Sequence, residues 1–181
     1  MSNKITLYHG GYQEIREPDL NRGREDIDFG VGFYLTPDIE MAKRYAYNWG
    51  IPVVSVYEVD LDALTKYEFS LNEEWLDYIK QNYHFKDSLV DKYDILIGPS
   101  ADNTIFCESM LYDYFSIDKV SEFFNSVGYP VQYVLKTPTA TKHCHFVESF
   151  TLTEEEKTKC HELFLEELHR SYETKKLCEK E

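Results

Sequence analysis

A glycine-rich stretch near the N-terminus contains the residue types and the spacing best suited to chemistry. Residues 28–36 read Asp-Phe-Gly-Val-Gly-Phe-Tyr-Leu-Thr, with glycine at positions 30 and 32. Glycine lets the backbone approach a ligand closely or turn sharply, and it is costly where neither is needed. His9 ends an N-terminal strand pattern and Gln132 lies in a late one. Together, the three segments indicate a nucleotide-binding site.

The distribution of charge favours an anionic ligand only in the first fifty residues. The chain of 181 residues has a net charge of −14, from 19 basic and 33 acidic side chains. This excess argues against nonspecific binding to nucleic acid or to anionic lipid, because such binding needs Lys and Arg to neutralise phosphates. Residues 1–50 hold six basic and eight acidic side chains, including Arg16, Arg22 and Arg24. Arg24 lies nearest the glycine-rich stretch and is the first candidate to bind an anionic group.

Hydropathy and cysteine spacing indicate a cytoplasmic protein with no membrane partner and no resident metal. No apolar run approaches the roughly 20 residues that cross a bilayer, and the N-terminus lacks the apolar stretch of a signal peptide. The cysteines show neither a disulfide framework nor a Cys-x-x-Cys pair, so we expect reduced thiols. His143-Cys144-His145 has metal-ligand residue types, but successive side chains on a strand point in opposite directions and do not complete a tetrahedral set.

Strand and helix patterns alternate along the chain and predict an α+β fold with short strands. A chain of this length, with 43% hydrophobic residues, can bury the core of one domain. Alternating or apolar runs predict strands at residues 5–9, 33–35, 53–59, 93–99, 131–135 and 144–147. Capping residues predict helices that begin after Thr36, Asn72, Asn103, Ser116 and Thr153.

Two of these helices bear on the site and on the domain organisation. Thr36 is expected to cap a helix that ends at Gly50, and helical spacing places Trp49 on the apolar stripe of that helix. The terminal segment, residues 153–181, reads as an amphipathic helix. We expect it to dock on the domain formed by residues 1–152.

The glycine-rich stretch is one of four motifs that together resemble a known family. The motifs lie at residues 7–10, 28–36, 97–102 and 131–134. Over about residues 5–150, the chain resembles the DUF3990 family of small bacterial and phage domains, which is related to the ADP-ribosyltransferase superfamily. The relevant His–Tyr–Glu branch of that superfamily contains diphtheria toxin and the poly-ADP-ribose polymerases. The resemblance implies an ADP-ribosyltransferase-like fold, with two small packed sheets and interspersed helices.

The resemblance also implies that NAD is the substrate, and it gives each matching residue a role. His9 would hydrogen-bond a ribose of NAD, and Gly10 would hold the nicotinamide carboxamide through its backbone. Tyr34 would stack on the nicotinamide ring. Gln132 takes the place of the catalytic Glu of the superfamily. The remaining expected NAD-binding positions are Arg24 (for the pyrophosphate), Gly30, Gly32 and Thr36.

The amide at Gln132 leaves two functions open. A carboxylate orients a ribose hydroxyl, offsets positive charge at the anomeric carbon and accepts a proton, whereas a neutral amide does only the first of these well. The resemblance implies a toxin-like NAD-dependent mono-ADP-ribosyltransferase with an unknown macromolecular acceptor. The alternative is a non-catalytic module that binds NAD, ADP-ribose or a protein. A large gain in NAD cleavage on changing Gln132 to Glu would argue for an attenuated or non-catalytic natural protein.

Overall fold

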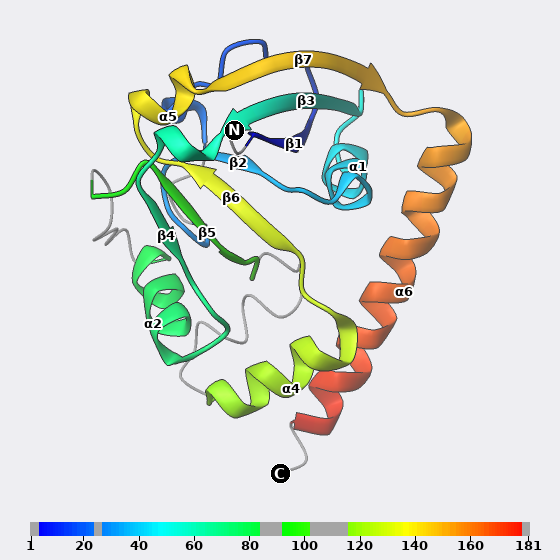
Figure 1. Cartoon of the computed structure of the whole chain (residues 1–181). Coiled ribbons are helices and arrows are strands. Elements are labelled where there is room, and N and C mark those ends of the chain that lie inside the picture. The colour runs from blue at the N-terminus through cyan, green and yellow to red at the C-terminus, as the bar shows by residue number, and fades with distance from the viewer. Residues whose placement is uncertain (1–3, 24–26, 84–91, 102–115, 179–181) are drawn as a thin grey trace.

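Two small sheets form the framework of the protein (Figure 1). The computed structural model describes residues 4–23, 27–83, 92–101 and 116–178. Within these residues, one sheet is antiparallel and has the order β1 (Lys4–Gly11), β3 (Val53–Asp60), β7 (Cys144–Thr151). The other has the order β2 (Phe33–Leu35), β6 (Val131–Leu135), β5 (Ile95–Pro99), β4 (Lys66–Glu68). Its strands are antiparallel except for the parallel pair β4–β5. An α+β fold with two small sheets is confirmed.

Helices surround these sheets and connect their strands. They are α1 (Ile39–Tyr47), α2 (Glu73–Asn82), α4 (Ile117–Val127), α5 (Pro138–Lys142) and α6 (Glu154–Cys178), with short 3-10 turns at Leu20–Arg22 (η1) and Leu61–Ala63 (η2). The helix expected after Asn103 lies outside the described residues. In the described part of the chain, no helix is both long enough and apolar enough to span a membrane.

Local capping explains where most of these helices begin and end. The Asn72 side chain accepts a hydrogen bond from the Trp75 amide at 3.0 Å, which starts α2. Thr153 and Glu156 form a reciprocal capping box at the start of α6. Helix α4 begins directly after Ser116, although that side chain makes no capping bond, and Gly128, with φ of 77°, stops it in a conformation that favours glycine. The predicted starts of α2, α4 and α6 are therefore confirmed.

The start of α1 corrects the sequence prediction. Asp38, not Thr36, caps this helix, because the Asp38 side chain accepts from the Glu40 amide at 2.9 Å. Pro37 disfavours a helical conformation at Thr36, and the backbone there stays extended. The Thr36 N–H and C=O instead bond to Tyr8, at 2.9 and 2.8 Å, and so join β1 to the end of β2.

The end of α1 also differs from the expectation. The helix ends at Tyr47, before Gly50, so its apolar spacing does not extend to position 49. Trp49 is 51% exposed, and the expectation that it lies in the core is wrong. The buried face of the helix consists of Met41, Ala42 and Ala46.

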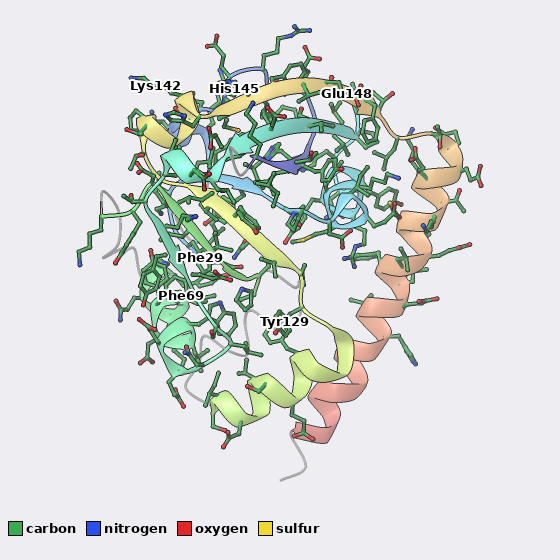
Figure 2. The ribbon with its side chains drawn as sticks, in the orientation of Figure 1. Phe29, Phe69, Tyr129, Lys142, His145 and Glu148 are labelled. Atoms are coloured by element: carbon green, nitrogen blue, oxygen red, sulfur yellow. The ribbon has the colours of Figure 1, made fainter. Side chains whose placement is uncertain are left out.

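Apolar side chains from both sheets pack together in one cluster. Leu7 of β1, Phe33 of β2 and Tyr57 of β3 are among its buried members. A second cluster lies on the other face of the four-stranded sheet, under α2 and α4, and includes Phe29 and Phe69 (Figure 2). The first cluster lies between the two sheets, and α2 and α4 cover the other face of the four-stranded sheet. The end of β1 lies where the two sheets meet.

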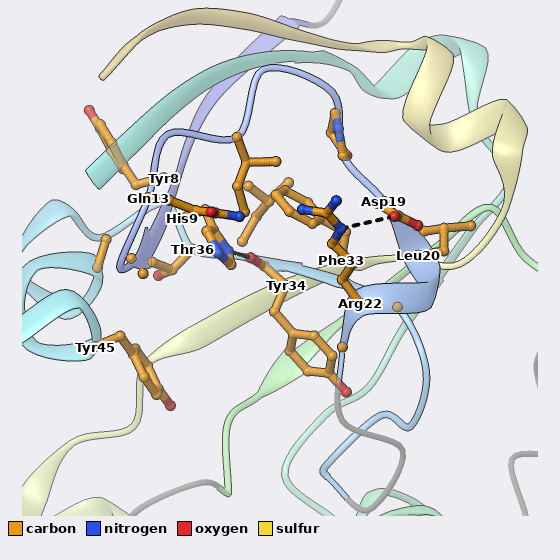
Figure 3. A pocket seen from close by; sticks show the side chains of 18 of the residues that line it. Tyr8, His9, Gln13, Asp19, Leu20, Arg22, Phe33, Tyr34, Thr36 and Tyr45 are labelled. Carbon is orange, nitrogen blue, oxygen red and sulfur yellow. Dashed lines mark hydrogen bonds and ion pairs between the residues drawn. The ribbon is translucent and has the colours of Figure 1, made fainter. Parts of the chain in front are cut away.

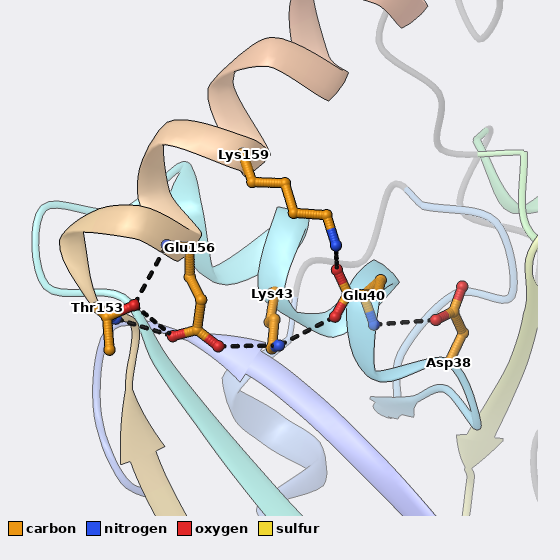
Figure 4. A network of polar contacts seen from close by, with 6 residues as sticks. All are labelled: Asp38, Glu40, Lys43, Thr153, Glu156 and Lys159. Carbon is orange, nitrogen blue, oxygen red and sulfur yellow. Dashed lines mark hydrogen bonds and ion pairs between the residues drawn. The ribbon is translucent and has the colours of Figure 1, made fainter.

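The first turns of α6 pack against α1 (Figure 4). Lys43 of α1 bonds both Glu40 and Glu156, at 3.0 and 2.9 Å, and Lys159 bonds Glu40 at 2.9 Å. Beneath these ion pairs, Cys160 is buried in a small apolar cluster with the alanines of α1. The helix therefore contacts the body of the protein through its N-terminal part, and the domain boundary at residue 152 stays a prediction.

Candidate active site

A cleft of about 1130 Å³ opens where the end of β1 meets β2 and α1 (Figure 3). Residues 8–23 and parts of 27–36 line it, together with side chains of α1 and with Gln132 of β6. Ligand pockets commonly enclose about 300–1,000 Å³, so the space suffices for a dinucleotide-sized molecule. His9, Tyr34 and Gln132, on three different strands, therefore share one cleft.

His9 presents a neutral imidazole to this cleft. Its Nδ1 lies 2.8 Å from the backbone oxygen of Tyr34, and a carbonyl oxygen can only accept, so Nδ1 carries the proton. The ring stacks on Phe33, with centroids 4.7 Å apart. Burial lowers the pKa of His9, although the bond to the Tyr34 carbonyl partly opposes the shift. At neutral pH, Nε2 is therefore a hydrogen-bond acceptor whose direction the strand pairing fixes.

Gly10 allows α1 to lie directly on β1. A Cβ built at this position would lie 2.0 Å from the backbone oxygen of Ala42, so any other residue would push the helix away. In an antiparallel ladder, alternate residues direct their backbone groups to the same edge. Tyr8 directs its N–H and C=O to Thr36, on the side away from β3, so Gly10 directs its own pair to that same edge. Beyond Thr36, this edge borders the cleft.

The Tyr34 hydroxyl fixes the turn that precedes β2. It donates to the Gly30 oxygen at 2.7 Å and accepts from the Phe29 amide at 3.0 Å. Gly30 has φ of 67°, a left-handed conformation, and its amide closes the turn on Ile27. Lys136, which is buried, donates from Nζ to the Phe29 and Val31 oxygens at 2.5 and 2.6 Å. These hydrogen bonds hold the glycine-rich stretch in place beside the cleft.

Gly32 and Thr36 contact the neighbouring strand β6. A Cβ at Gly32 would lie 2.6 Å from the Val134 side chain and 2.8 Å from the Leu135 oxygen. The Thr36 hydroxyl donates to the Val131 oxygen at 3.1 Å and accepts from the Asp38 amide. Both residues line the cleft, whereas Gly30 does not. Their contacts with β6 hold this side of the cleft together.

Gln132 is paired with a buried carboxylate that has no assigned role in the sequence motifs. Its Nε2 donates to Oδ2 of Asp28 at 2.9 Å, and Gln132 and Asp28 are 4% and 1% exposed. The same carboxylate accepts from the Ala101 amide at 2.6 Å, and from the hydroxyls of Ser100 and Tyr83. Asp28 therefore joins the glycine-rich stretch to the ends of β5 and α2 and to the start of β6.

One comparison with known proteins decides the family. The family described as "Protein of unknown function (DUF3990)" matches residues 5–146, which is most of the chain. The protein belongs to the DUF3990 family. No curated protein and no solved structure matched the chain. The match includes every residue of the cleft and stops within β7, before α6.

Two of the three candidate arginines of this DUF3990 protein lie at the cleft. Arg16 and Arg22 line the cleft and are both largely exposed. Arg16 pairs with Glu14 at 2.6 Å and Arg22 with Asp19 at 3.3 Å. Arg24, the first candidate for an anionic group, lies outside the described residues. Either exposed pair can exchange its carboxylate for a ligand anion at low cost, because exposed ion pairs contribute about 0–1 kcal/mol.

Cysteine and histidine elsewhere in the DUF3990 fold form no comparable site within the described residues. There, no group of three or more potential metal ligands comes together. Cys144 is a free, buried cysteine, and burial raises the pKa of its thiol to about 12. A thiol held protonated in this way is a poor nucleophile and a poor metal ligand.

Sequence reasoning gave no role to Asp28 or Lys136. Both are charged side chains buried beside the glycine-rich stretch. Asp28 opens that stretch in the sequence, but its partners Ser100, Ala101 and Gln132 are 72 to 104 residues away. A charged residue directly beside an apolar run, as at Lys136 after residues 131–135, is the available signal for such a role.

Proposed function

We propose that the cleft binds NAD and that the protein is an NAD-dependent mono-ADP-ribosyltransferase. The observation that carries this proposal is the convergence of His9, Tyr34 and Gln132 on one cleft, although they lie far apart in the sequence. The resemblance of their motifs to the His–Tyr–Glu branch of the ADP-ribosyltransferases supports it. The volume of the cleft suits a dinucleotide.

Each side chain has a specific part in this proposal. Nε2 of His9 accepts a hydrogen bond from a ribose hydroxyl, and the edge of Gly10 holds the carboxamide, with its N–H donating and its C=O accepting. The ring of Tyr34 forms a flat wall for nicotinamide, while its hydroxyl keeps the adjacent turn in place. Positioning of this kind makes a large contribution when two reactants must meet in one geometry.

The reaction breaks the bond between the nicotinamide nitrogen and the anomeric carbon of ribose. Nicotinamide leaves with the bonding electrons, and the acceptor forms a new bond to the anomeric carbon. The acceptor loses its proton to a base of its own or to solvent, because the amide of Gln132 cannot accept it. This requirement favours an acceptor group that is already nucleophilic.

A second candidate is a non-catalytic module that binds NAD or ADP-ribose. The neutral amide at Gln132 favours it, because a cationic transition state gains most from a facing carboxylate. Such a module would keep the affinity of the cleft for the dinucleotide and would release no nicotinamide.

NAD labelled in its adenylate half distinguishes these functions. The purified protein is incubated with bacterial lysate, and both released nicotinamide and label on macromolecules are measured. Binding of NAD to the purified protein is measured separately by calorimetry. His9→Ala removes the proposed acceptor, and His145→Ala, on an exposed position of β7 outside the cleft, is the matched control (Figure 2).

Each outcome of this experiment has one meaning. Transfer of label that His9→Ala abolishes and His145→Ala retains supports the transferase. Nicotinamide release without transfer identifies a glycohydrolase, and binding without release identifies the module. A protein that does not bind NAD contradicts the proposal.

A further inference from the structure

The contact between Asp28 and Gln132 determines which way the glutamine amide faces. Nε2 of Gln132 lies 2.9 Å from Oδ2 of Asp28 and 3.5 Å from the backbone oxygen of Pro99. A carboxylate that receives the Ala101 amide on the same oxygen, and a backbone carbonyl, are both acceptors. Only the NH₂ group of the amide can face them. The two acceptors therefore fix which end of the amide is the NH₂ group.

This orientation leaves the amide oxygen on the side away from Asp28. Within the described residues, Oε1 of Gln132 has no hydrogen-bond partner, and it is not among the fully enclosed polar atoms. Gln132 lines the cleft, and the residue as a whole is only 4% exposed. An accessible acceptor on a buried, oriented side chain is available to a ligand in that cleft.

We propose that Asp28 is a positioning residue that locks Gln132 with its Oε1 facing the cleft, so that the site takes a ligand through a hydroxyl or N–H donor. For the identity of the ligand this inference rests on the proposed function, in which the donor is a ribose hydroxyl of NAD. Asp28 also lines the cleft, but its part in this proposal is to hold the amide and not to contact the ligand. It acts through the amide, and its other contacts to β5 and α2 fix its own position.

A glutamate at position 132 would conflict with Asp28. A glutamate there would bring a second carboxylate to about the 2.9 Å that now separates Nε2 from Asp28. Two carboxylates at such a distance do not both ionise, so one pKa rises strongly. Gln132→Glu is then expected to lose stability at neutral pH instead of gaining catalytic efficiency.

The first test measures this conflict without any ligand. The melting temperatures of wild type, Gln132→Glu and Gln132→Met are compared at pH 5 and pH 8. A raised folded-state pKa means that stability falls as pH rises above the ordinary Glu value of about 4.3. Relative to Gln132→Met, Gln132→Glu should lose about 5–10 °C between the two pH values, while wild type should keep a constant difference.

The surrounding groups do not obscure this signal. Tyr83 and Ser100 reach Asp28 as hydroxyls, Tyr45 approaches Ser100, and Lys136 is bound to the Phe29 and Val31 oxygens. All of them are present in both variants, so their titration cancels in the comparison. An equal melting-temperature difference at pH 5 and pH 8 would overturn the proposed orientation.

The second test separates the position of Asp28 from its charge. Asp28→Asn can keep an oxygen facing Ala101 and Gln132 and turn its NH₂ toward the Tyr83 hydroxyl, whereas Asp28→Ala removes every hydrogen bond of the side chain. Dissociation constants for NAD are measured by calorimetry, with folding of each variant verified by circular dichroism. Asp28→Ala and Gln132→Met should weaken binding more than tenfold, and Asp28→Asn by about threefold or less.

The two tests fail in different ways. If wild type binds NAD and Asp28→Ala binds it as tightly, the positioning role is wrong and the proposed ligand stands. If wild type does not bind NAD, the proposed function is wrong, and the pH comparison alone decides whether Asp28 orients Gln132.

Discussion

Changing Gly10 to alanine should displace α1 from β1 and destabilise the protein. The added Cβ would lie 2.0 Å from the Ala42 oxygen and 2.8 Å from the Ala46 nitrogen, which are both backbone atoms of the helix. Ordinary contacts begin near 3.4 Å, so the helix must move by about 1 Å or more. Ala42 and Ala46 are fully buried and leave no space to absorb the shift. Overpacking of this kind costs about 3 kcal/mol, the upper part of the usual range.

For a domain of this size, that cost corresponds to a fall in melting temperature of about 6–12 °C. The assay is thermal unfolding by calorimetry at pH 7 without ligand, which separates the packing role of Gly10 from any role in binding. Gly50→Ala is the matched control, because a Cβ there meets nothing within 4 Å. It should leave the melting temperature unchanged or slightly raise it. A Gly10→Ala protein that melts within 2 °C of wild type would refute the reasoning.

Three further predictions follow from single contacts. Tyr34→Phe should lower the free energy of unfolding, measured by denaturant unfolding, by about 1–3 kcal/mol, because the buried Phe29 amide loses its acceptor. The control is Tyr133→Phe, which should change this free energy little, because the Tyr133 hydroxyl has no hydrogen bond within the described residues. Glu156 has its pKa lowered to about 2, chiefly by the Thr153 amide and by Lys43, so it stabilises the fold above pH 4.5 and loses that contribution as the pH falls toward 2. Melting temperatures at pH 3 and pH 6 should therefore differ less in Glu156→Gln than in wild type, whereas exposed Glu155→Gln should behave as wild type. NAD affinity measured by calorimetry should stay constant from pH 8 to 6.5 and fall at lower pH. Burial lowers the pKa of His9, and protonation of Nε2 removes the hydrogen-bond acceptor. A decline that begins above pH 7 would contradict the role of His9 as a neutral acceptor.

Local signals account for the elements that the sequence predicted correctly. Asn72 and the Thr153 capping box act within four residues of chain, and Gly128 stops α4 through its own backbone conformation. The strands at 33–35 and 131–135 have the predicted bounds because apolar runs define them. By contrast, β4 has three residues and depends on parallel pairing with β5, so it has no local pattern of its own. The short helix α5 begins with a Thr137 cap followed by proline, a signal that the sequence does contain.

The sequence motifs grouped His9, Tyr34 and Gln132, which share one cleft in the structure, but did not indicate the hydrogen bonds around them. His9 could be placed on the inner face of its strand by alternation, and the structure stacks it on Phe33. The bond from Gln132 to Asp28 depends on two chain segments 104 residues apart, and no pattern within either segment encodes it. For the same reason the sequence could not show that Asp28, rather than solvent, lies behind the amide.

The partners of Asp28 also set the order in which this cleft can appear during folding. Its hydrogen bonds span 54 to 104 residues, so each requires the closure of a long segment of chain. Contacts of such high sequence separation slow folding and form together with the global structure. A nascent chain in which β6 has not yet left the ribosome lacks Gln132 as a wall of the cleft. We therefore expect the chain to become able to bind a ligand only late in folding.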